Sequence, residues 1–147
     1  MVKPNSIKEI AVVLKRQGNK LKPVNQAELA FIEEKYKTAL PKVYKEFLLL
    51  MGKSAGVYML GSSVFYDELF FLRQGADELI FENNMPPIPN EAFVFWMHQG
   101  YQVAYFNLNE GDDPPVYYFS ESSEKNVVEL KEKTLTDFFV SQLEFIC

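Results

Sequence analysis

The sequence predicts a single α+β domain in which N-terminal helices come first, a central and mostly antiparallel sheet follows, and a C-terminal helix closes the chain. Three observations predict this fold class. Capped amphipathic segments fill residues 6–52 and recur near the C-terminus. Short apolar segments separated by turn residues fill positions 92–130. The two kinds of segment occupy separate parts of the sequence and do not alternate, which favours α+β over α/β.

Four segments carry the start signals of helices. In each, a capping pair or a first-turn proline stands directly before an apolar stripe with helical spacing. These starts are Ser6 with Glu9, Asn25 with Glu28, Pro41, and Thr134 with Asp137. Gly18 and Gly52 are expected to end the first and the third of these helices.

A fifth helix is expected from Glu68 to about Phe81, with Asp67 as its capping residue. Gly75 lies inside this segment, where glycine costs about 1 kcal/mol relative to alanine. We therefore expect the helix to bend or break at Gly75.

Strands are expected in five places, bounded by turn residues. The ranges are Gly56–Leu60, Ala92–His98, Tyr101–Leu108, Val116–Phe119 and Val127–Leu130. Gly100 supplies the positive φ that the turn between the second and third strands requires. Alternate side chains of the second strand form two apolar sets, which are Phe93, Phe95 and Met97, and Val94 and Trp96. Because both faces of this strand are apolar, it should be central in the sheet.

Length and composition fit one globular domain over residues 1–147. The chain has 147 residues, of which 48% are hydrophobic. A chain of this size buries enough surface to fold without a disulfide or a structural metal. Cys147 is the only cysteine, so an internal disulfide is excluded. The N-terminus has no apolar signal core, and the apolar runs are too short to span a bilayer. We expect a cytoplasmic protein without a membrane partner.

The sequence offers no convergent set of catalytic or metal-binding residues. His98 is the only histidine, whereas metal sites built on N and S ligands normally need several His or Cys. We expect His98 to be a structural residue that makes a hydrogen bond at the end of a hairpin. A phosphate-binding loop ending at Ser54 is excluded because Phe47 stands where its first glycine belongs. The segment 107–118 lacks the spacing of a calcium loop. We predict no catalytic residue, no metal, no cofactor and no enzymatic activity.

Charge is distributed unevenly along the chain. Residues 1–53 hold eleven Lys or Arg and five Glu, a net of +6, whereas residues 54–124 hold one Arg and eleven Asp or Glu, a net of −10. These acids either form one negative surface, which would attract a basic partner, or are scattered solvating charges. The acidic balance disfavours nucleic-acid binding.

Four tyrosines are possible surface aromatics for protein contact, with core or half-buried sheet positions as the alternative. They are Tyr58, Tyr66, Tyr101 and Tyr117.

Several motifs resemble the SUKH superfamily. They are Leu40-Pro41-x-x-Tyr44-x-x-Phe47-Leu48-x-x-x-Gly52, Phe95-Trp96-Met97-His98-Gln99-Gly100-Tyr101 with Tyr105-Phe106, Asp112-Asp113-Pro114-Pro115-Val116-Tyr117-Tyr118, and Thr134-Leu135-Thr136-Asp137-Phe138-Phe139. They occur in the family's order and cover about residues 25–147, with Met51 where an asparagine is common. The superfamily includes fungal cell-wall assembly regulators and many bacterial immunity proteins. The resemblance implies an α+β fold and, by analogy, a protein-binding function.

The resemblance and the acidic middle together predict an immunity protein that binds and neutralises a bacterial toxin stoichiometrically. The partner would be a toxin domain with a basic surface, such as a nuclease, because a negative surface speeds association with it. The alternative is a regulatory or scaffold domain that binds other proteins. The oligomeric state is left open.

The predicted partner-binding face combines the end of the central hairpin and its following turn with the segment at 66–68. Its residues are Tyr66, Asp67, Glu68, Glu110, Asp112, Asp113 and Glu121. Pro114 and Pro115 should stiffen the turn and hold its charges out to solvent at low entropic cost.

Overall fold

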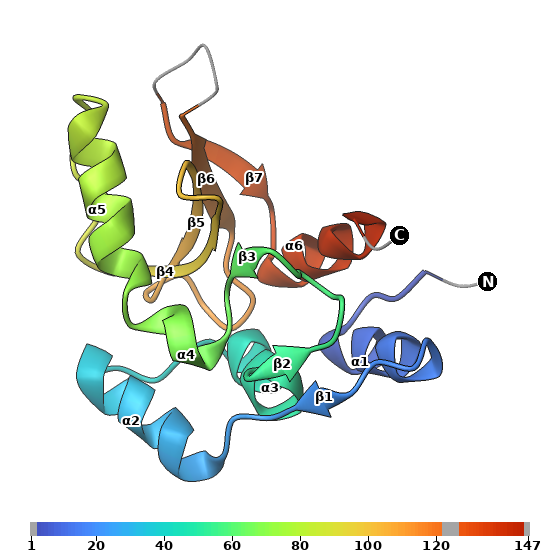
Figure 1. Cartoon of the computed structure of the whole chain (residues 1–147). Coiled ribbons are helices and arrows are strands. Elements are labelled where there is room, and N and C mark those ends of the chain that lie inside the picture. The colour runs from blue at the N-terminus through green and yellow to red at the C-terminus, as the bar shows by residue number, and fades with distance from the viewer. Residues whose placement is uncertain (1–2, 122–126, 146–147) are drawn as a thin grey trace.

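The computed structural model describes residues 3–121 and 127–145. The first elements are α1 (Ile7–Arg16), β1 (Leu21–Lys22), α2 (Gln26–Tyr36), α3 (Lys42–Met51), β2 (Ser54–Ala55) and β3 (Ser62–Ser63). Next come α4 (Tyr66–Leu69), α5 (Leu72–Glu82), β4 (Ala92–His98), β5 (Gln102–Asn107), β6 (Val116–Ser120) and β7 (Glu129–Glu132). α6 (Leu135–Ser141) and the 3-10 helix η1 (Gln142–Phe145) close the described part (Figure 1). The predicted α+β class is confirmed.

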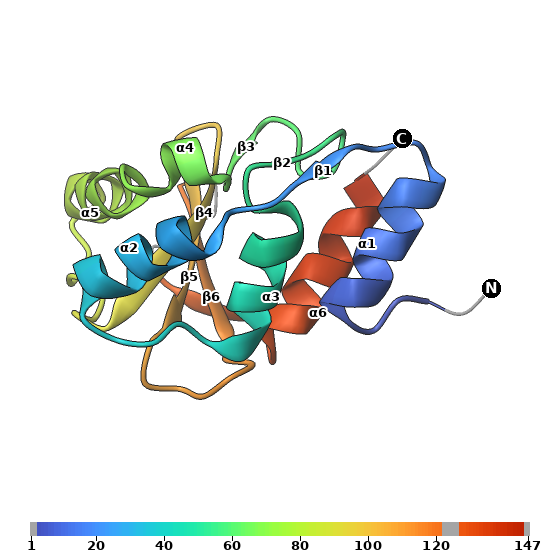
Figure 2. The same ribbon diagram turned by 90° about the horizontal axis from the view of Figure 1, so that it is seen from below.

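The main sheet has five antiparallel strands in the order β3-β4-β5-β6-β7, and β1 pairs with β2 in a separate ribbon. α5 lies along one face of this sheet (Figure 1), whereas α3 and α6 lie on the other side beside α1 (Figure 2). None of the described helices has the length and apolar character needed to cross a membrane.

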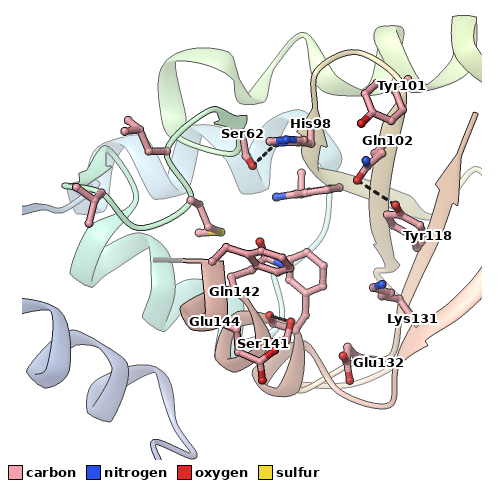
Figure 3. Close-up of a pocket in the computed structure, with 16 residues that line it drawn as sticks. Ser62, His98, Tyr101, Gln102, Tyr118, Lys131, Glu132, Ser141, Gln142 and Glu144 are labelled. Atoms are coloured by element: carbon pink, nitrogen blue, oxygen red, sulfur yellow. Dashed lines mark hydrogen bonds between the residues drawn. The ribbon is translucent and has the colours of Figure 1, made fainter. Parts of the chain in front are cut away.

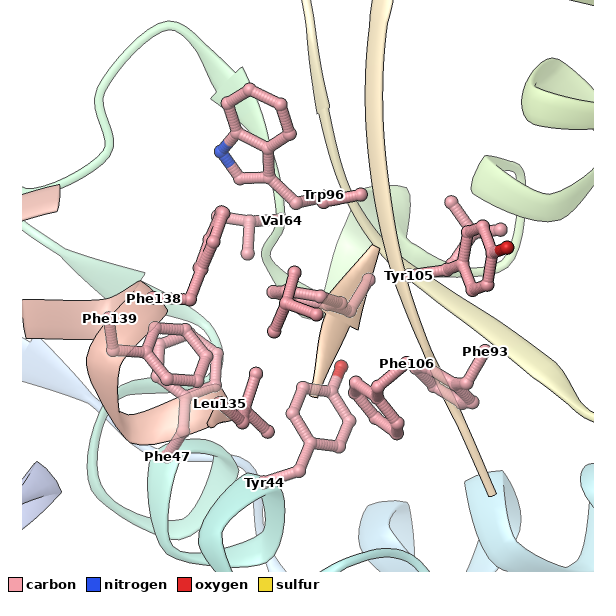
Figure 4. Packing of buried hydrophobic residues seen from close by; sticks show 14 of the residues in the cluster. Tyr44, Phe47, Val64, Phe93, Trp96, Tyr105, Phe106, Leu135, Phe138 and Phe139 are labelled. Atoms are coloured by element: carbon pink, nitrogen blue, oxygen red, sulfur yellow. The ribbon is translucent and has the colours of Figure 1, made fainter. Parts of the chain in front are cut away.

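Aromatic rings fill the space between the sheet and the helices α3 and α6 (Figure 4). Phe47 on α3 stacks on Phe139 of α6 with ring centroids 4.5 Å apart. Phe93 on β4 stacks on Phe106 of β5 at 5.2 Å, and Tyr44 meets both rings edge-on. Residues of the Leu40–Gly52 motif therefore form the centre of the core, which gives that motif a structural role.

The predicted capping residues Ser6, Asn25 and Thr134 are confirmed, whereas Pro41 is the N-cap of α3 and not part of its first turn. The Asn25 side chain accepts from the backbone N–H of Glu28, whose carboxylate accepts from the backbone N–H of Asn25, so both halves of the capping box are present. The Thr134 hydroxyl accepts from the N–H of Asp137 at 3.1 Å. Ser6 caps α1 in the same way, but the carboxylate of Glu9 accepts from the Ser6 hydroxyl, not from its backbone.

The strand predicted at Gly56–Leu60 is wrong. This segment is a series of turns between β2 and β3, because Gly56, Met59 and the following Gly61 adopt positive φ values of 65°, 54° and 89°, which a strand does not allow. Tyr58 is fully buried, and its hydroxyl donates to the carbonyl of Phe139, so its prediction as a surface aromatic is also wrong.

The helix predicted from Glu68 to Phe81 is divided in two, and the break lies at Phe70–Phe71, not at Gly75. Phe65, not Asp67, occupies the N-cap of α4. Gly75 lies inside α5 where that helix passes close to β4, and a Cβ atom at position 75 would stand 2.9 Å from the Met97 Cε atom. The last strand is β7, two residues later than predicted.

Candidate functional site

A groove of about 570 Å³ opens on the face of the sheet that α6 partly covers (Figure 3). Strands β4 to β7 form its floor. The loop at 57–62 forms one wall, and the end of α6 with η1 forms another. Side chains from distant parts of the chain converge there, among them Ser62, His98, Tyr118, Lys131 and Gln142. It is larger than a hollow of about 260 Å³ beside Phe81.

A β-bulge in β4 supplies the floor of the groove. The register with β5 shifts between Val94 and Trp96, so Phe95 is the extra residue. Consecutive side chains Phe95 and Trp96 consequently lie on the same face, where both rings contact Phe138 of α6. The two alternating sets predicted for this strand are therefore wrong beyond Phe95, and Met97 faces α5 instead. Bulges re-aim side chains in this way beside binding sites.

A second bulge lies in β7. Its register with β6 shifts between the partners of Val116 and Tyr117, which leaves Lys131 as the extra residue. Lys131 and its neighbour Glu132 both line the groove as a result. Two opposite charges thus stand side by side at one edge of the floor.

Aromatic rings and polar side chains on the floor of the groove contact one another from strand to strand. His98 stacks parallel to Trp96 with centroids 5.9 Å apart. The register places Ala104 between Trp96 and Tyr118, and this small side chain leaves the hollow between two large ones. The Tyr118 hydroxyl donates to Gln102 at 2.9 Å, and the Lys131 ammonium lies 4.7 Å from the centroid of the Tyr118 ring.

The hydrogen bond expected for His98 is present, with its Nδ1 atom 3.0 Å from the Ser62 hydroxyl oxygen (Figure 3). A serine nucleophile also requires a third group that orients the histidine. Within residues 3–121 and 127–145, no carboxylate hydrogen-bonds to His98. The pair fixes the hairpin end against β3, and the expectation of no enzymatic activity stays a prediction.

The rim of the groove is apolar and exposed. Leu60 and Phe145 expose 74% and 75% of their surface, and Val57 exposes 48%. They stand on two opposing walls, the 57–62 loop and η1. The Trp96 indole nitrogen at the base of the groove is buried and has no hydrogen-bond partner in the described structure. An aromatic floor inside an apolar rim is a typical composition for a contact with another protein.

The predicted segment at 66–68 lies at the C-terminal end of α3, where the Tyr66 N–H donates to the carbonyl of Gly52. Tyr66 is half-buried, and burial raises the pKa of its hydroxyl, with Glu28 adding to the effect. The Glu68 carboxylate accepts from the Ser63 hydroxyl at 2.6 Å. Asp67 lies beside them in the first turn of α4.

The acidic turn after β5 lies at the opposite end of α3. The Asp112 side chain accepts from the backbone N–H of Lys42, at a donor–acceptor distance of 3.3 Å, and its carbonyl accepts from the N–H of Val43. The Asp113 carboxylate accepts from the backbone N–H and the hydroxyl of Thr136. The Glu110 carboxylate accepts from the Asn107 amide and the Tyr117 hydroxyl. These acids bind within the chain and are not simply held out to solvent.

Glu121 lies at a third place, beside the tip of the β4–β5 hairpin. Its backbone N–H donates to the carbonyl of Tyr101, and its carboxylate accepts from the Asn83 side chain. The 66–68 segment and the acidic turn lie at the two ends of α3, whose ten residues separate them by about 15 Å. β6 separates the acidic turn from Glu121 by a similar length. The seven residues do not form one surface, and their role in partner binding stays a prediction.

Sequence reasoning missed most of the groove. Gln102, Tyr118 and Lys131 carry no local signal, because a bulge depends on the partner strand and not on a sequence motif. Of the predicted surface tyrosines, Tyr101 lines the groove and is half-buried, and Tyr117 is half-buried on the other face of the sheet.

A comparison with family models places residues 23–141 in one family, which spans more than half of the chain. No curated protein matches the chain at a significant level. The matched region contains the Leu40–Gly52 motif, all of the main sheet and α6. The chain belongs to the SMI1/KNR4 family (SUKH-1).

Proposed function

We propose that this protein binds another protein through its groove and acts as an immunity protein that neutralises a bacterial toxin stoichiometrically. The observation that carries the proposal is the exposed apolar rim of Val57, Leu60 and Phe145 around an aromatic floor. Large apolar side chains exposed on both walls of one hollow are costly in water and are satisfied when a partner covers them. Membership of a family that includes toxin immunity proteins supports the toxin as partner.

The charges around the groove favour a partner with a basic surface. Glu132 and Glu144 line the groove together with one cation, Lys131, whose ammonium lies over the Tyr118 ring, and the exposed Lys3 lies 3.9 Å from Glu144. The carboxylates that line the groove thus outnumber the lysine. A nuclease domain fits this chemistry, because it must hold phosphate and is therefore basic. The protein would act in the cytoplasm, by covering the toxin or holding it inactive.

Growth assays with a toxin domain encoded directly beside the gene for this chain test the proposal. The toxin domain alone should arrest growth, and co-expression of this chain should restore it through a 1:1 complex. Leu60→Ser and Phe145→Ser should each weaken the complex at least about tenfold, because each removes an apolar anchor. Leu130→Ser is the matched control, since Leu130 is exposed on the other face of the sheet.

The alternative function, a regulatory or scaffold domain, gives a different result in the same assay. A complex that forms through the groove but does not restore growth supports the scaffold. The absence of any complex with the toxin domain overturns the immunity function.

A further inference from the structure

The outer face of α5 exposes two phenylalanines. Phe71, at the N-cap, exposes 71% of its surface, and Phe81, in the last turn, exposes 82%. Ten residues separate them, which is about 15 Å along a helix. Both lie on the side opposite to Leu72, Ala76, Leu79 and Ile80, which α5 buries against the sheet. Phenylalanines with this exposure, both on one helix face, are unusual in a protein that works alone.

The polar residues of the same face are acidic or neutral. They are Gln74, Asp77, Glu78 and Glu82. Arg73 is the only basic residue of the helix, and its charge is paired with Asp77. Its guanidinium bonds to the Asp77 carboxylate and to the carbonyls of Pro89 and Ala92. Glu78 and Glu82 are left without a cation in the described structure.

A second hollow, of about 260 Å³, lies beside Phe81. Met85, Pro87 and Ile88 form its apolar side, and the ion pair of Arg73 with Asp77 forms its polar side. Phe81 protrudes beside this hollow, so the surface offers a partner both an exposed ring and a concave site.

We propose that the outer face of α5 is a second docking surface, taken by a protein that presents basic side chains around an apolar patch. Charge complementarity selects this occupant, because Glu78, which accepts from the Gln74 amide, and Glu82 flank the exposed Phe81, and no cation among the described residues pairs with either carboxylate. A second copy docked through the same face would bring Glu78 and Glu82 of both copies together, which like-charge repulsion disfavours. α5 covers one face of the sheet (Figure 1), whereas the groove opens on the other face, so the two partners do not compete for one surface.

An NMR titration of the ¹⁵N-labelled full chain tests this surface. The probe is a synthetic amphipathic helical peptide made of leucine and lysine, and the same peptide with glutamate in place of lysine is the reference. Amide shifts should appear at residues 71–82 with the lysine peptide only, and its affinity should fall as salt rises. Phe81→Ser combined with Glu78→Lys should weaken binding at least about tenfold.

Two control variants test whether binding depends on this surface, and not on the exposed apolar area or the net charge of the protein as a whole. Leu60→Ser removes an exposed apolar side chain from the groove rim, and Glu34→Lys reverses an exposed glutamate on α2, and both positions lie outside the α5 surface. Both variants should bind the lysine peptide as the unaltered chain does. The proposal is overturned if the shifts lie elsewhere, if both peptides bind equally, or if Phe81→Ser with Glu78→Lys has no effect. Concentration-dependent shifts at residues 71–82 without peptide would instead identify a second copy as the occupant and overturn the proposed partner.

Discussion

Asp113 fixes the start of α6 through Thr136. Its carboxylate accepts from the Thr136 backbone N–H at 2.9 Å and from the Thr136 hydroxyl at 2.8 Å. These two bonds tie the turn after β5 to the closing helix and place a negative charge at a helix N-terminus, where the helix dipole favours it. The sequence suggests an acidic turn available to a partner, whereas the fold uses its charge as a cap.

Asp113→Ala is therefore expected to lower the free energy of unfolding by about 0.5–2 kcal/mol, the usual cost of losing a capping side chain. Urea denaturation at neutral pH measures the change. Asp67→Ala is the matched control, because the Asp67 side chain is exposed and the structure gives it no hydrogen bond. Equal stability of the two variants would show that the bonds of Asp113 contribute nothing.

Two buried tyrosines should respond in opposite ways to removal of the hydroxyl. The Tyr44 hydroxyl points into the aromatic cluster (Figure 4) and has no hydrogen-bond partner in the described structure, whereas the Tyr58 hydroxyl donates to Phe139. Burial raises the pKa of both hydroxyls, which stay protonated at neutral pH. Tyr44→Phe should raise the free energy of unfolding by about 1–2 kcal/mol, and Tyr58→Phe should lower it by a similar amount.

Guanidinium denaturation of both variants checks the signs, and each variant serves as the control of the other. Destabilisation by Tyr44→Phe would mean that its hydroxyl bonds to a buried water molecule.

The Glu28–Lys53 ion pair predicts a pH dependence of stability. The pKa of the Glu28 carboxyl lies below its ordinary value of 4.5. The largest cause is the hydrogen bond from the backbone N–H of Asn25, and the second is the ammonium of Lys53, which lies 2.8 Å from the carboxylate. A depressed folded-state pKa adds stability above the unfolded value, and this stability is lost as pH falls through the folded value. Glu28→Gln should therefore destabilise the protein at pH 7, and the difference should vanish as pH falls well below 4.5. Thermal melts across that range measure it, and a constant difference would contradict the prediction.

Local signals predicted the helix ends, because a cap and its partner lie three residues apart. The pair Asn25 and Glu28 is one case, and the pair Thr134 and Asp137 is another. The turn acids were misread because their partners lie far away in the sequence. Asp113 bonds to a residue 23 positions later, and Asp112 bonds to one 70 positions earlier. Patterns that span only a few neighbouring residues cannot predict hydrogen bonds between residues so far apart in the sequence.

The groove was not predictable for a related reason. Strict alternation along β4 would point Trp96 toward α5, and only the bulge at Phe95, formed against β5, turns it into the groove. Phe81 is exposed because it lies on the face of α5 opposite to Leu72, Ala76, Leu79 and Ile80, which are buried.

Substitutions at Phe47 and Phe81 compare how much a buried and an exposed phenylalanine contribute to the free energy of unfolding. Phe47 is fully buried between Tyr44 and Phe139, whereas Phe81 is 82% exposed. Phe47→Ala should cost about 3–5 kcal/mol, because it removes a buried ring and leaves a cavity among aromatic neighbours. Phe81→Ala should change the free energy of unfolding by less than about 0.5 kcal/mol. Chemical denaturation compares the two variants. Retained stability with lost partner binding in Phe47→Ala would contradict its structural role, because a residue with no exposed surface reaches a partner only through the fold.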